Sequence, residues 1–285
     1  MSLPRYYAWL TRLQDASRLV GHDSGQDTLT VHRRLRAAGG EVSGDVLHGV
    51  ILDALAATSD DATPVPLTVL DAGCGLGGTL LFLHARIGAR GLGITLSPDQ
   101  AARAMDASAT RGAGDAVRFV VRDFDTPLDD LLPGGVDLVV AIESLAHAPD
   151  PAATIARLAG TIRPGGRMIV VDDAPSDGLT GNDVDLAGFR RGWHAPRILG
   201  DAALDRAIDA AGLTRVHDVD LTPRLVERPA ISLATRLALA RVAWPLAALT
   251  PAAVLHDAIA GGLHLERLYA RGVARYRLVV ARRLR

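Results

Sequence analysis

The sequence contains no lysine, although arginine is abundant: all 31 basic residues among its 285 are arginines. This absence excludes every chemistry that depends on a lysine amine. No Schiff base can form, no P-loop lysine can hold a phosphate, and the tyrosine–lysine pair of short-chain dehydrogenases is missing. The formal net charge is −1, so the overall charge gives no indication of a nucleic-acid partner.

Cysteine is almost as scarce, because Cys74 is the only one in the chain. A single cysteine cannot form an intrachain disulfide or supply a cysteine cluster for a metal. For Cys74 itself we favour a small side chain that fits a tight turn, and a reactive thiol is the alternative. The first ten residues hold neither the apolar core nor the cleavage site of a signal peptide, so we expect a cytoplasmic location.

The charge that is present is unevenly distributed along the chain. Residues 222–285 carry eleven arginines against three acids, a formal +8, which leaves −9 for the remainder. The same region contains an apolar segment, residues 231–265, in which Arg241, Pro245 and Pro251 argue against a membrane span. We therefore expect cap helices over an active site or at a homodimer contact. Peripheral membrane contact and a true span are the alternatives.

The most informative stretch is Val-Leu-Asp-Ala-Gly-Cys-Gly-Leu-Gly-Gly-Thr at residues 69–79. It predicts an apolar strand that ends in an acid, followed by a glycine-rich turn and the start of a helix. This layout exposes backbone N–H groups and a helix N-terminus to a ligand, and the glycines let the backbone approach it closely. Asp71 would be unfavourable beside a pyrophosphate, but it suits a ligand that carries an ammonium group.

Strand and helix patterns alternate after this loop. The expected strands are 68–72, 91–96, 117–121, 136–142, 168–171, 214–219 and 276–281, and the expected helices are 79–87, 98–110, 151–162 and 201–212. Ser97, Asp150 and Asp201 are the expected N-caps, the first two followed by proline. The alternation predicts an α/β protein with a Rossmann-like, doubly wound, mostly parallel seven-stranded sheet that binds ligands at the carboxyl ends of its strands.

We expect four regions along the chain. Residues 1–62 would form an N-terminal helical cap, because apolar residues recur there at helical spacing. Residues 63–221 would form the Rossmann-like core, residues 222–270 an inserted helical cap, and residues 271–285 the last strand of the core.

Four motifs fall in order at the expected strand ends, and together they resemble those of class I S-adenosylmethionine-dependent methyltransferases. They are the glycine loop, Gly-Ile-Thr-Leu-Ser-Pro-Asp-Gln at 93–100, Val-Arg-Asp-Phe at 121–124, and Ile-Glu-Ser-Leu-Ala-His at 142–147 with Arg-Pro-Gly-Gly at 163–166. Thr95 stands where most of these enzymes, and most NAD-binding folds, have an acid for the ribose. This departure resembles the branch of tocopherol and sterol methyltransferases and cyclopropane-fatty-acid synthases, and it disfavours an NAD enzyme.

The resemblance implies S-adenosylmethionine as the cofactor and implies the contacts to it. Asp71 would serve the amino end of the methionine moiety, Gln100 would make a polar contact near the ribose, and Asp123 would accept a hydrogen bond from the adenine amino group. An exposed loop aspartate is the alternative for Asp123. The full implied set is Asp71, Gly73, Cys74, Gly75, Gly77, Thr95, Leu96, Gln100, Asp123, Phe124 and Ile142.

Two side chains after the fourth strand are candidates for the chemistry. Glu143 and His147 follow the strand end toward which the cofactor's methyl group should point, and His147 is a candidate general base near neutral pH. The alternatives are a hydrogen-bonding role in the loop for Glu143 and a supporting role for His147. Asp172 and Asp173 end the next strand, but no third ligand has convincing spacing, so we expect no metal site.

The methyl acceptor is the least defined part of the prediction. Residues 189–196 resemble the acceptor-site segment of the same branch, and Trp193 and His194 within it are candidate acceptor contacts. His22, in the N-terminal region, is a further candidate. A hydrophobic small molecule is expected, of terpenoid, polyketide-like or lipid type, with methylation at carbon favoured over oxygen or nitrogen. No nucleic acid is expected as a partner. A non-catalytic or assembly protein on a methyltransferase fold is the alternative of another class.

Overall fold

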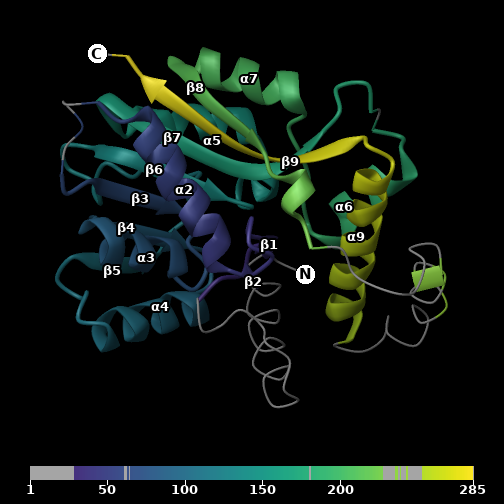
Figure 1. The fold of residues 1–285 in the computed structure, drawn as a ribbon, viewed down its shortest axis with the longest axis horizontal. Coiled ribbons are helices and arrows are strands. Elements are labelled where there is room, and N and C mark those ends of the chain that lie inside the picture. Colours follow the sequence, from purple (N-terminus) through teal and green to yellow (C-terminus); the bar gives the residue numbers. More distant parts are fainter. Residues whose placement is uncertain are drawn as a thin grey trace.

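The computed structural model describes residues 29–60, 63, 65–179, 181–226, 235, 236, 238, 242 and 252–284. A seven-stranded sheet lies at its centre, with strand order β5-β4-β3-β6-β7-β9-β8 (Figure 1). The strands are β3 (Thr68–Ala72), β4 (Arg90–Thr95), β5 (Val117–Val121), β6 (Val136–Ile142), β7 (Ile162–Pro175), β8 (Leu213–Asp220) and β9 (Ala274–Arg283). Strands β3 to β7 are parallel, and β9 is antiparallel to both neighbours. The predicted fold class is confirmed.

Helices cover both faces of this sheet (Figure 1). They are α2 (Asp45–Thr58), α3 (Gly78–Ile87), α4 (Pro98–Thr110), α5 (Pro151–Gly160), α6 (Val184–Gly192), α7 (Asp201–Ala210) and α9 (Ala252–Ala270), with the 3-10 turns η2 (Leu145–His147) and η3 (Thr222–Arg224). Alternation along β7 separates two cores. Ile169 and Val171 pack in the cluster that includes α2 and α3, whereas Met168 and Val170 pack in the cluster that includes α5 and α7. The consecutive acids at the end of β7 therefore face opposite sides of the sheet.

Two of the three predicted N-caps are confirmed. The side chains of Ser97 and Asp150 each accept the backbone N–H three residues on, at 3.4 and 3.3 Å, and proline occupies the first helical position in both cases. The third prediction is wrong, because the N-cap of α7 is Gly200 and the carboxylate of Asp177 accepts the backbone N–H of Ala202 in the first turn, at 3.1 and 3.3 Å. Asp201 instead accepts a hydrogen bond from Nη1 of Arg277 at 2.6 Å. The charge of a buried arginine decided the orientation of this carboxylate.

The N-terminal region is only partly the helical cap that was expected. The apolar stripe of residues 46–55 does form α2, with Leu47, Ile51 and Leu55 buried. Before it the chain forms a short antiparallel ribbon that was not predicted, β1 (Leu35–Arg36) and β2 (Val42–Ser43), because strands this short carry no periodic signal. Residues 1–28, including the candidate His22, lie outside the described residues.

The C-terminal region gives a partial test of the expected cap. Helix α9 packs closely on α6 at two glycines. A Cβ atom added to Gly192 would lie only 2.7 Å from Cα of Gly261. Within the described ranges, no helix is long and apolar enough to cross a membrane. Most of the apolar segment 231–251 lies outside those ranges, and the four-region division of the chain stays a prediction.

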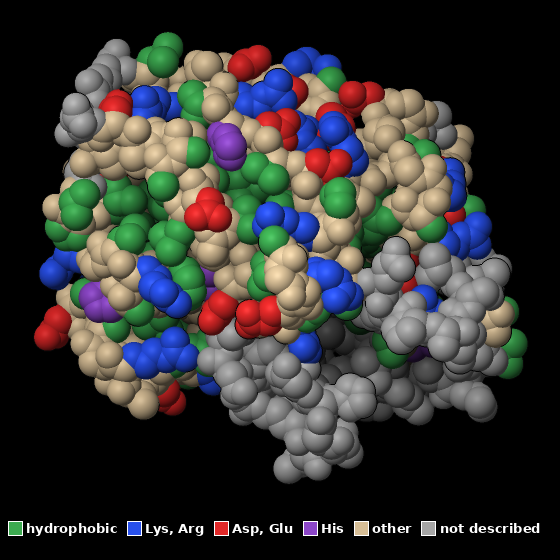
Figure 2. Space-filling view, in the orientation of Figure 1, with side chains coloured by type: hydrophobic (Ala, Val, Ile, Leu, Met, Phe, Trp, Pro, Cys, Tyr) green, Lys and Arg blue, Asp and Glu red, His purple; other side chains and the backbone are tan. Residues whose placement is uncertain are grey.

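The positive charge of the C-terminal region is largely offset by neighbouring acids. Arg277 of β9 is buried and pairs with Asp201 and Asp218, and Arg275 pairs with Asp201 as well. On the face of the molecule shown in Figure 2, acidic and basic side chains are interspersed. On that face, the basic side chains that are drawn in colour do not gather apart from the acids.

Candidate active site

The glycine loop after β3 is kept tight by its own neighbours. Gly73, Gly75 and Gly77 all have positive φ, at 88°, 54° and 83°, a region that favours glycine. A Cβ atom on Gly73 would lie 2.5 Å from Cβ of Ser144, and one on Gly75 would lie 2.8 Å from Cγ2 of Val31. All three glycines are required by packing within the chain, because a Cβ atom on Gly77 would likewise lie 2.6 Å from Cζ of Phe119. Val31 also shows that the segment before β1 crosses the loop.

Asp71 is the next-to-last residue of β3 and lies beneath this loop, with one carboxylate oxygen that has no hydrogen-bond partner in the described structure. Only 2% of the residue is exposed, and its Oδ2 atom has no hydrogen-bond partner among the described residues. Burial raises the pKa of the carboxyl to about 7. A buried carboxylate without a partner is costly, and a ligand ammonium would supply both the charge and the hydrogen bond. The residues present thus fit the amino end of S-adenosylmethionine.

The residues expected near the ribose are brought together at the end of β4. The hydroxyl of Thr95 donates to Oε1 of Gln100 at 2.8 Å and accepts the backbone N–H of Ser97 at 3.2 Å. Both Thr95 and Gln100 are buried, and this bond leaves the amide NH₂ of Gln100 as a donor. Leu96 follows Thr95 directly and is half-buried. Their contacts to a cofactor stay predictions.

Four further predicted cofactor residues lie at the same edge of the sheet. Asp123 follows β5, and its Oδ1 accepts the backbone N–H of Asp125 at 2.8 Å, which fixes the turn that holds Phe124. Ile142 ends β6 and is half-buried. Cys74 is buried, and desolvation, followed by the nearby charge of Asp71, raises the pKa of its thiol well above the ordinary value. A protonated, buried thiol favours the small-side-chain interpretation of Cys74.

Glu143 follows β6 in an uncommon backbone conformation. Its φ is +48°, in the left-handed region that non-glycine residues rarely adopt. Its Oε1 accepts hydrogen bonds from the hydroxyl of Tyr276 at 2.7 Å and from the backbone N–H of Arg33 at 3.0 Å. Residues in this backbone region cluster at functional sites. The conformation therefore supports Glu143 as a site residue, but its catalytic role stays a prediction.

Asp173, at the end of β7, is bound by an arginine from the N-terminal region. Arg33 makes two hydrogen bonds to its carboxylate, with Nη2 at 2.7 Å from Oδ2 and Nη1 bound to Oδ1. Nη1 of Arg33 also donates to the hydroxyl of Tyr269 at 2.6 Å. The guanidinium carbon lies 5.3, 5.5 and 5.2 Å from the ring centroids of Trp193, Tyr269 and Tyr276. We call these three rings, with Glu143 and Asp173, the Arg33 cage.

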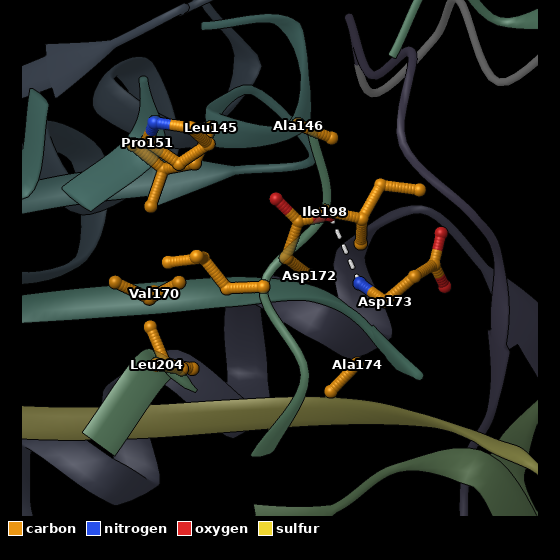
Figure 3. A pocket seen from close by; sticks show the side chains of 10 residues that line it. Leu145, Ala146, Pro151, Val170, Asp172, Asp173, Ala174, Ile198 and Leu204 are labelled. Atoms are coloured by element: carbon orange, nitrogen blue, oxygen red, sulfur yellow. Dashed lines mark hydrogen bonds between the residues drawn. The ribbon is translucent and has the colours of Figure 1, made fainter. Parts of the chain in front are cut away.

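Asp172 lies on the other face of β7 and lines a small apolar pocket (Figure 3). Leu145 and Ala146 of η2, Val170 of β7 and Leu204 of α7 contribute to its walls. Its Oδ1 accepts the backbone N–H of the next residue at 2.9 Å. Burial, followed by the charge of Asp173, raises the pKa of Asp172 to about 8. The two acids therefore do not form a paired site, and among the described residues no cluster of three or more His, Cys, Asp or Glu is placed to hold a metal.

His147 does not have the protonation behaviour that was expected. Its Nδ1 lies 3.3 Å from the carbonyl oxygen of His194, to which it donates a hydrogen bond. Burial lowers the pKa of the ring to about 4. The expectation that His147 titrates near neutral pH is therefore wrong, because η2 buries the ring against the segment around His194. A neutral imidazole at this position is a weaker base than the sequence suggested.

The cage contains residues that sequence reasoning missed. Trp193 was predicted to contact the acceptor, but Arg33, Tyr269 and Tyr276 were not singled out. Arg33 lies more than 200 residues before the two tyrosines, so no local motif joins it to them. The one available signal was scarcity: Phe, Trp and Tyr make up only 4% of the chain, and three of them gather around one guanidinium.

Comparisons with known proteins agree with this geometry. Residues 69–166 match the family model described as a methyltransferase domain. The probable chloroplastic tocopherol O-methyltransferase of Oryza sativa subsp. japonica is 43% identical over 119 residues, 41% of this chain and 32% of the relative. The 2-methyl-6-phytyl-1,4-hydroquinone methyltransferase of a Synechocystis strain is 34% identical over 117 residues, 39% of this chain and 34% of the relative. The chain thus spans about a third of the length of these curated relatives.

Solved structures extend the likeness to the whole fold. A geranyl diphosphate C-methyltransferase from Streptomyces coelicolor superimposes with a TM-score of 0.67 at 23% identity, covering 92% of this chain and 91% of the other. Residues 69–166 are thus similar to a methyltransferase domain, and the solved structure shares the fold. Over the matched 119 and 117 residues, the chain is similar to methyltransferases of the branch that the motifs resemble.

Proposed function

We propose that the chain transfers a methyl group from S-adenosylmethionine to a hydrophobic small molecule. The observation that carries this proposal is Asp71, a buried carboxylate with an unpartnered oxygen directly beneath the glycine loop. When bound, the cofactor supplies an activated methyl group on a sulfonium. Asp71 would hold its amino end, with the backbone of residues 73–77 alongside. Thr95, Gln100 and Asp123 would hold the ribose and adenine.

The acceptor end of the site would be formed by Glu143 and the Arg33 cage. Both hydrogen bonds to Glu143 reach Oε1, and no bond to Oε2 is found among the described residues. Oε2 is therefore the oxygen we assign to the acceptor, where it would take a proton or orient the nucleophile. The segment that carries Val31 and Arg33 crosses the glycine loop and reaches the end of β7, which would help to exclude water.

The atom that is methylated belongs to the same proposal. Resemblance to the sterol and tocopherol branch favours carbon. Nitrogen is the second candidate. The specific observation that favours it is the cage, in which three rings and the Asp173 carboxylate surround a guanidinium and Glu143 binds the backbone N–H of the same arginine. We also retain a cytoplasmic location and the absence of a nucleic-acid partner as proposals. For segment 231–265 we retain cap helices over the active site or at a homodimer contact, with peripheral membrane contact and a true span as the alternatives.

The first experiment is calorimetry of the purified chain with S-adenosylhomocysteine and, separately, with NAD. We expect binding of S-adenosylhomocysteine with a Kd of about 1 μM or tighter, equivalent to roughly 8 kcal/mol, and none of NAD. Binding of NAD without any response to S-adenosylhomocysteine would overturn the proposal. A chain that binds the cofactor but never turns over would instead favour a non-catalytic protein on this fold.

The second experiment measures transfer of an isotopically labelled methyl group. γ-Tocopherol, 2-methyl-6-phytyl-1,4-hydroquinone and geranyl diphosphate are the first acceptors to test, because they represent the similar proteins. With any acceptor that is methylated, Glu143→Gln should lower kcat far more than it weakens cofactor binding. An unchanged kcat would move the chemistry away from Glu143.

A further inference from the structure

The Arg33 cage has the composition of a cation-binding site. Its rings come from three separate elements: Trp193 from the end of α6, Tyr269 from α9 and Tyr276 from β9. All three centroids lie within 5.5 Å of the guanidinium carbon of Arg33. Aromatic faces attract a cation at this distance, and the attraction grows when water is excluded. Such an arrangement favours a positive charge over an uncharged apolar group.

The charges around the cage exclude a second, anionic interpretation. Arg33 is already engaged by both oxygens of Asp173, and its backbone N–H is engaged by Glu143. His32, which lies close enough to feel the charge of Glu143, has a pKa lowered by burial and is neutral. A phosphate or carboxylate would therefore meet Glu143 without a free cation nearby in the described part of the chain, and would have to break the buried Arg33–Asp173 pair.

Arg33, which fills the cage, and the two carboxylates of the cage belong to different parts of the fold. Glu143 and Asp173 are fixed at the ends of β6 and β7 in the central sheet, whereas Arg33 belongs to the segment before the two-residue strand β1. A ligand cation can therefore take the place of the guanidinium while the carboxylates and rings stay in position. The Gly73–Ser144 contact places this end of β6 directly beside the glycine loop.

We propose that the cage recognises a protonated amine on an apolar acceptor, that Arg33 fills it in the absence of ligand, and that acceptors with a phosphate or carboxylate at this position are rejected. This inference rests on the proposed function, because it takes the acceptor to lie at the ends of β6 and β7. It specifies the acceptor class further: an apolar body that carries an ammonium group.

The test uses three probes with the same prenyl chain and different charge: geranylamine, geraniol and geranyl diphosphate. Each is titrated by calorimetry at pH 7.5 into protein saturated with S-adenosylhomocysteine. We expect geranylamine to bind about tenfold more tightly than geraniol, and geranyl diphosphate to bind more weakly than both. Geranyl diphosphate binding as tightly as geranylamine, or geranylamine binding no better than geraniol, would overturn the inference.

Variants assign the preference to the cage. Arg33→Gln removes the competing cation and should raise the affinity for geranylamine several-fold without changing that for geraniol. Asp173→Asn should abolish the preference for the amine. If Asp173→Asn fails to fold, Trp193→Leu serves the same purpose. A preference for the amine that survives in whichever of these two variants folds would contradict the proposal. Arg36→Gln is the matched control, because Arg36 is exposed on the same segment and, among the described residues, its side chain bonds to the carbonyl oxygen of Gly40 at 3.4 Å.

The two proposals can fail separately. Saturation with S-adenosylhomocysteine is measured first, and its failure in the parent protein overturns the proposed function. A parent that binds S-adenosylhomocysteine but prefers geraniol or geranyl diphosphate keeps the proposed function and overturns only the amine preference.

Discussion

Two buried acids at the same edge of the sheet differ in whether the chain supplies their hydrogen-bond partners. Asp71, at the end of β3, is 2% exposed and has an oxygen without a partner in the described structure. Asp173, at the end of β7, is 4% exposed and is bound through both oxygens by Arg33. Burial alone therefore does not distinguish a structural acid from a ligand-binding one. What distinguishes them is whether the chain itself supplies the partner.

The same contrast separates the two ends of the proposed site. At the cofactor end, the chain leaves a charge requirement that a ligand must meet. At the acceptor end, the chain meets its own requirement with Arg33, so that end is complete without a ligand. The predictions below test this difference in order of decreasing expected effect.

Asp173→Asn should have the largest effect, because it breaks a buried ion pair and leaves Arg33 without its counter-charge. We expect the free energy of unfolding of the unliganded protein to fall by about 3–5 kcal/mol. Chemical denaturation monitored by circular dichroism measures this change. A loss of less than about 1 kcal/mol, typical of a surface pair, would show that the Arg33 cage does not hold the N-terminal segment.

Gly75→Val should weaken binding of S-adenosylhomocysteine by roughly 100-fold, or about 2.7 kcal/mol. A side chain there would collide with Val31 and distort the loop above Asp71. Gly112→Val is the matched control, because Gly112 also has a positive φ, of 68°, but nothing lies within 4 Å of its Cβ position. Both variants impose backbone strain, so an equal loss of binding in both would mean that the contact with Val31 is irrelevant.

Asp71→Asn should show the opposite pattern to Asp173→Asn. Binding of S-adenosylhomocysteine should weaken by about 1–3 kcal/mol, because a charge-assisted hydrogen bond is lost. The unliganded protein should be no less stable than the parent, since the substitution removes a buried charge that has no partner. Calorimetry and denaturation of the same sample give both numbers. Parallel destabilisation of the unliganded protein would show that Asp71 has a structural partner.

The smallest expected effect on ligand affinity comes from a pH dependence that originates at Asp71. Its folded-state pKa, about 7, lies above the ordinary value, so the unliganded fold binds this proton more tightly than the unfolded chain does. The stability of the unliganded protein should therefore decline as pH rises from about 4 to 7 through this group.

Ligand binding should reverse the protonation preference of Asp71. An ammonium partner favours the carboxylate, so binding at pH 6 should release a proton, and affinity should fall by up to about tenfold, or 1.4 kcal/mol, between pH 7 and 6. Calorimetry in buffers of different ionisation enthalpy counts the protons. Asp71→Asn should abolish the release, and release that persists in this variant would assign it to another group.

The cofactor end was largely predictable because its signals are local in the sequence. The strand, the glycine turn and the helix start of residues 68–79 depend on neighbouring residues and on φ angles that glycine adopts easily. The caps at Ser97 and Asp150 depend on contacts three residues away. Asp201 failed as a cap because a distant arginine on β9 competes for its carboxylate.

The acceptor end was less predictable because its contacts join distant segments. The sequence placed Glu143, His147 and Trp193 near one another, but the low pKa of His147 depends on its burial against the segment around His194. Asp172 and Asp173 looked like a pair, and both line the apolar pocket, but only the tertiary structure shows that Arg33 binds the carboxylate of Asp173.

The sequence by itself determined the fold class and the acid beneath a glycine loop, since these follow from local patterns. Only the tertiary structure decided which buried acids are satisfied by the chain. That outcome depends on Arg33 crossing from the N-terminal segment to a strand end 140 residues later. Partners that meet only in the folded state leave no spacing for a motif to record.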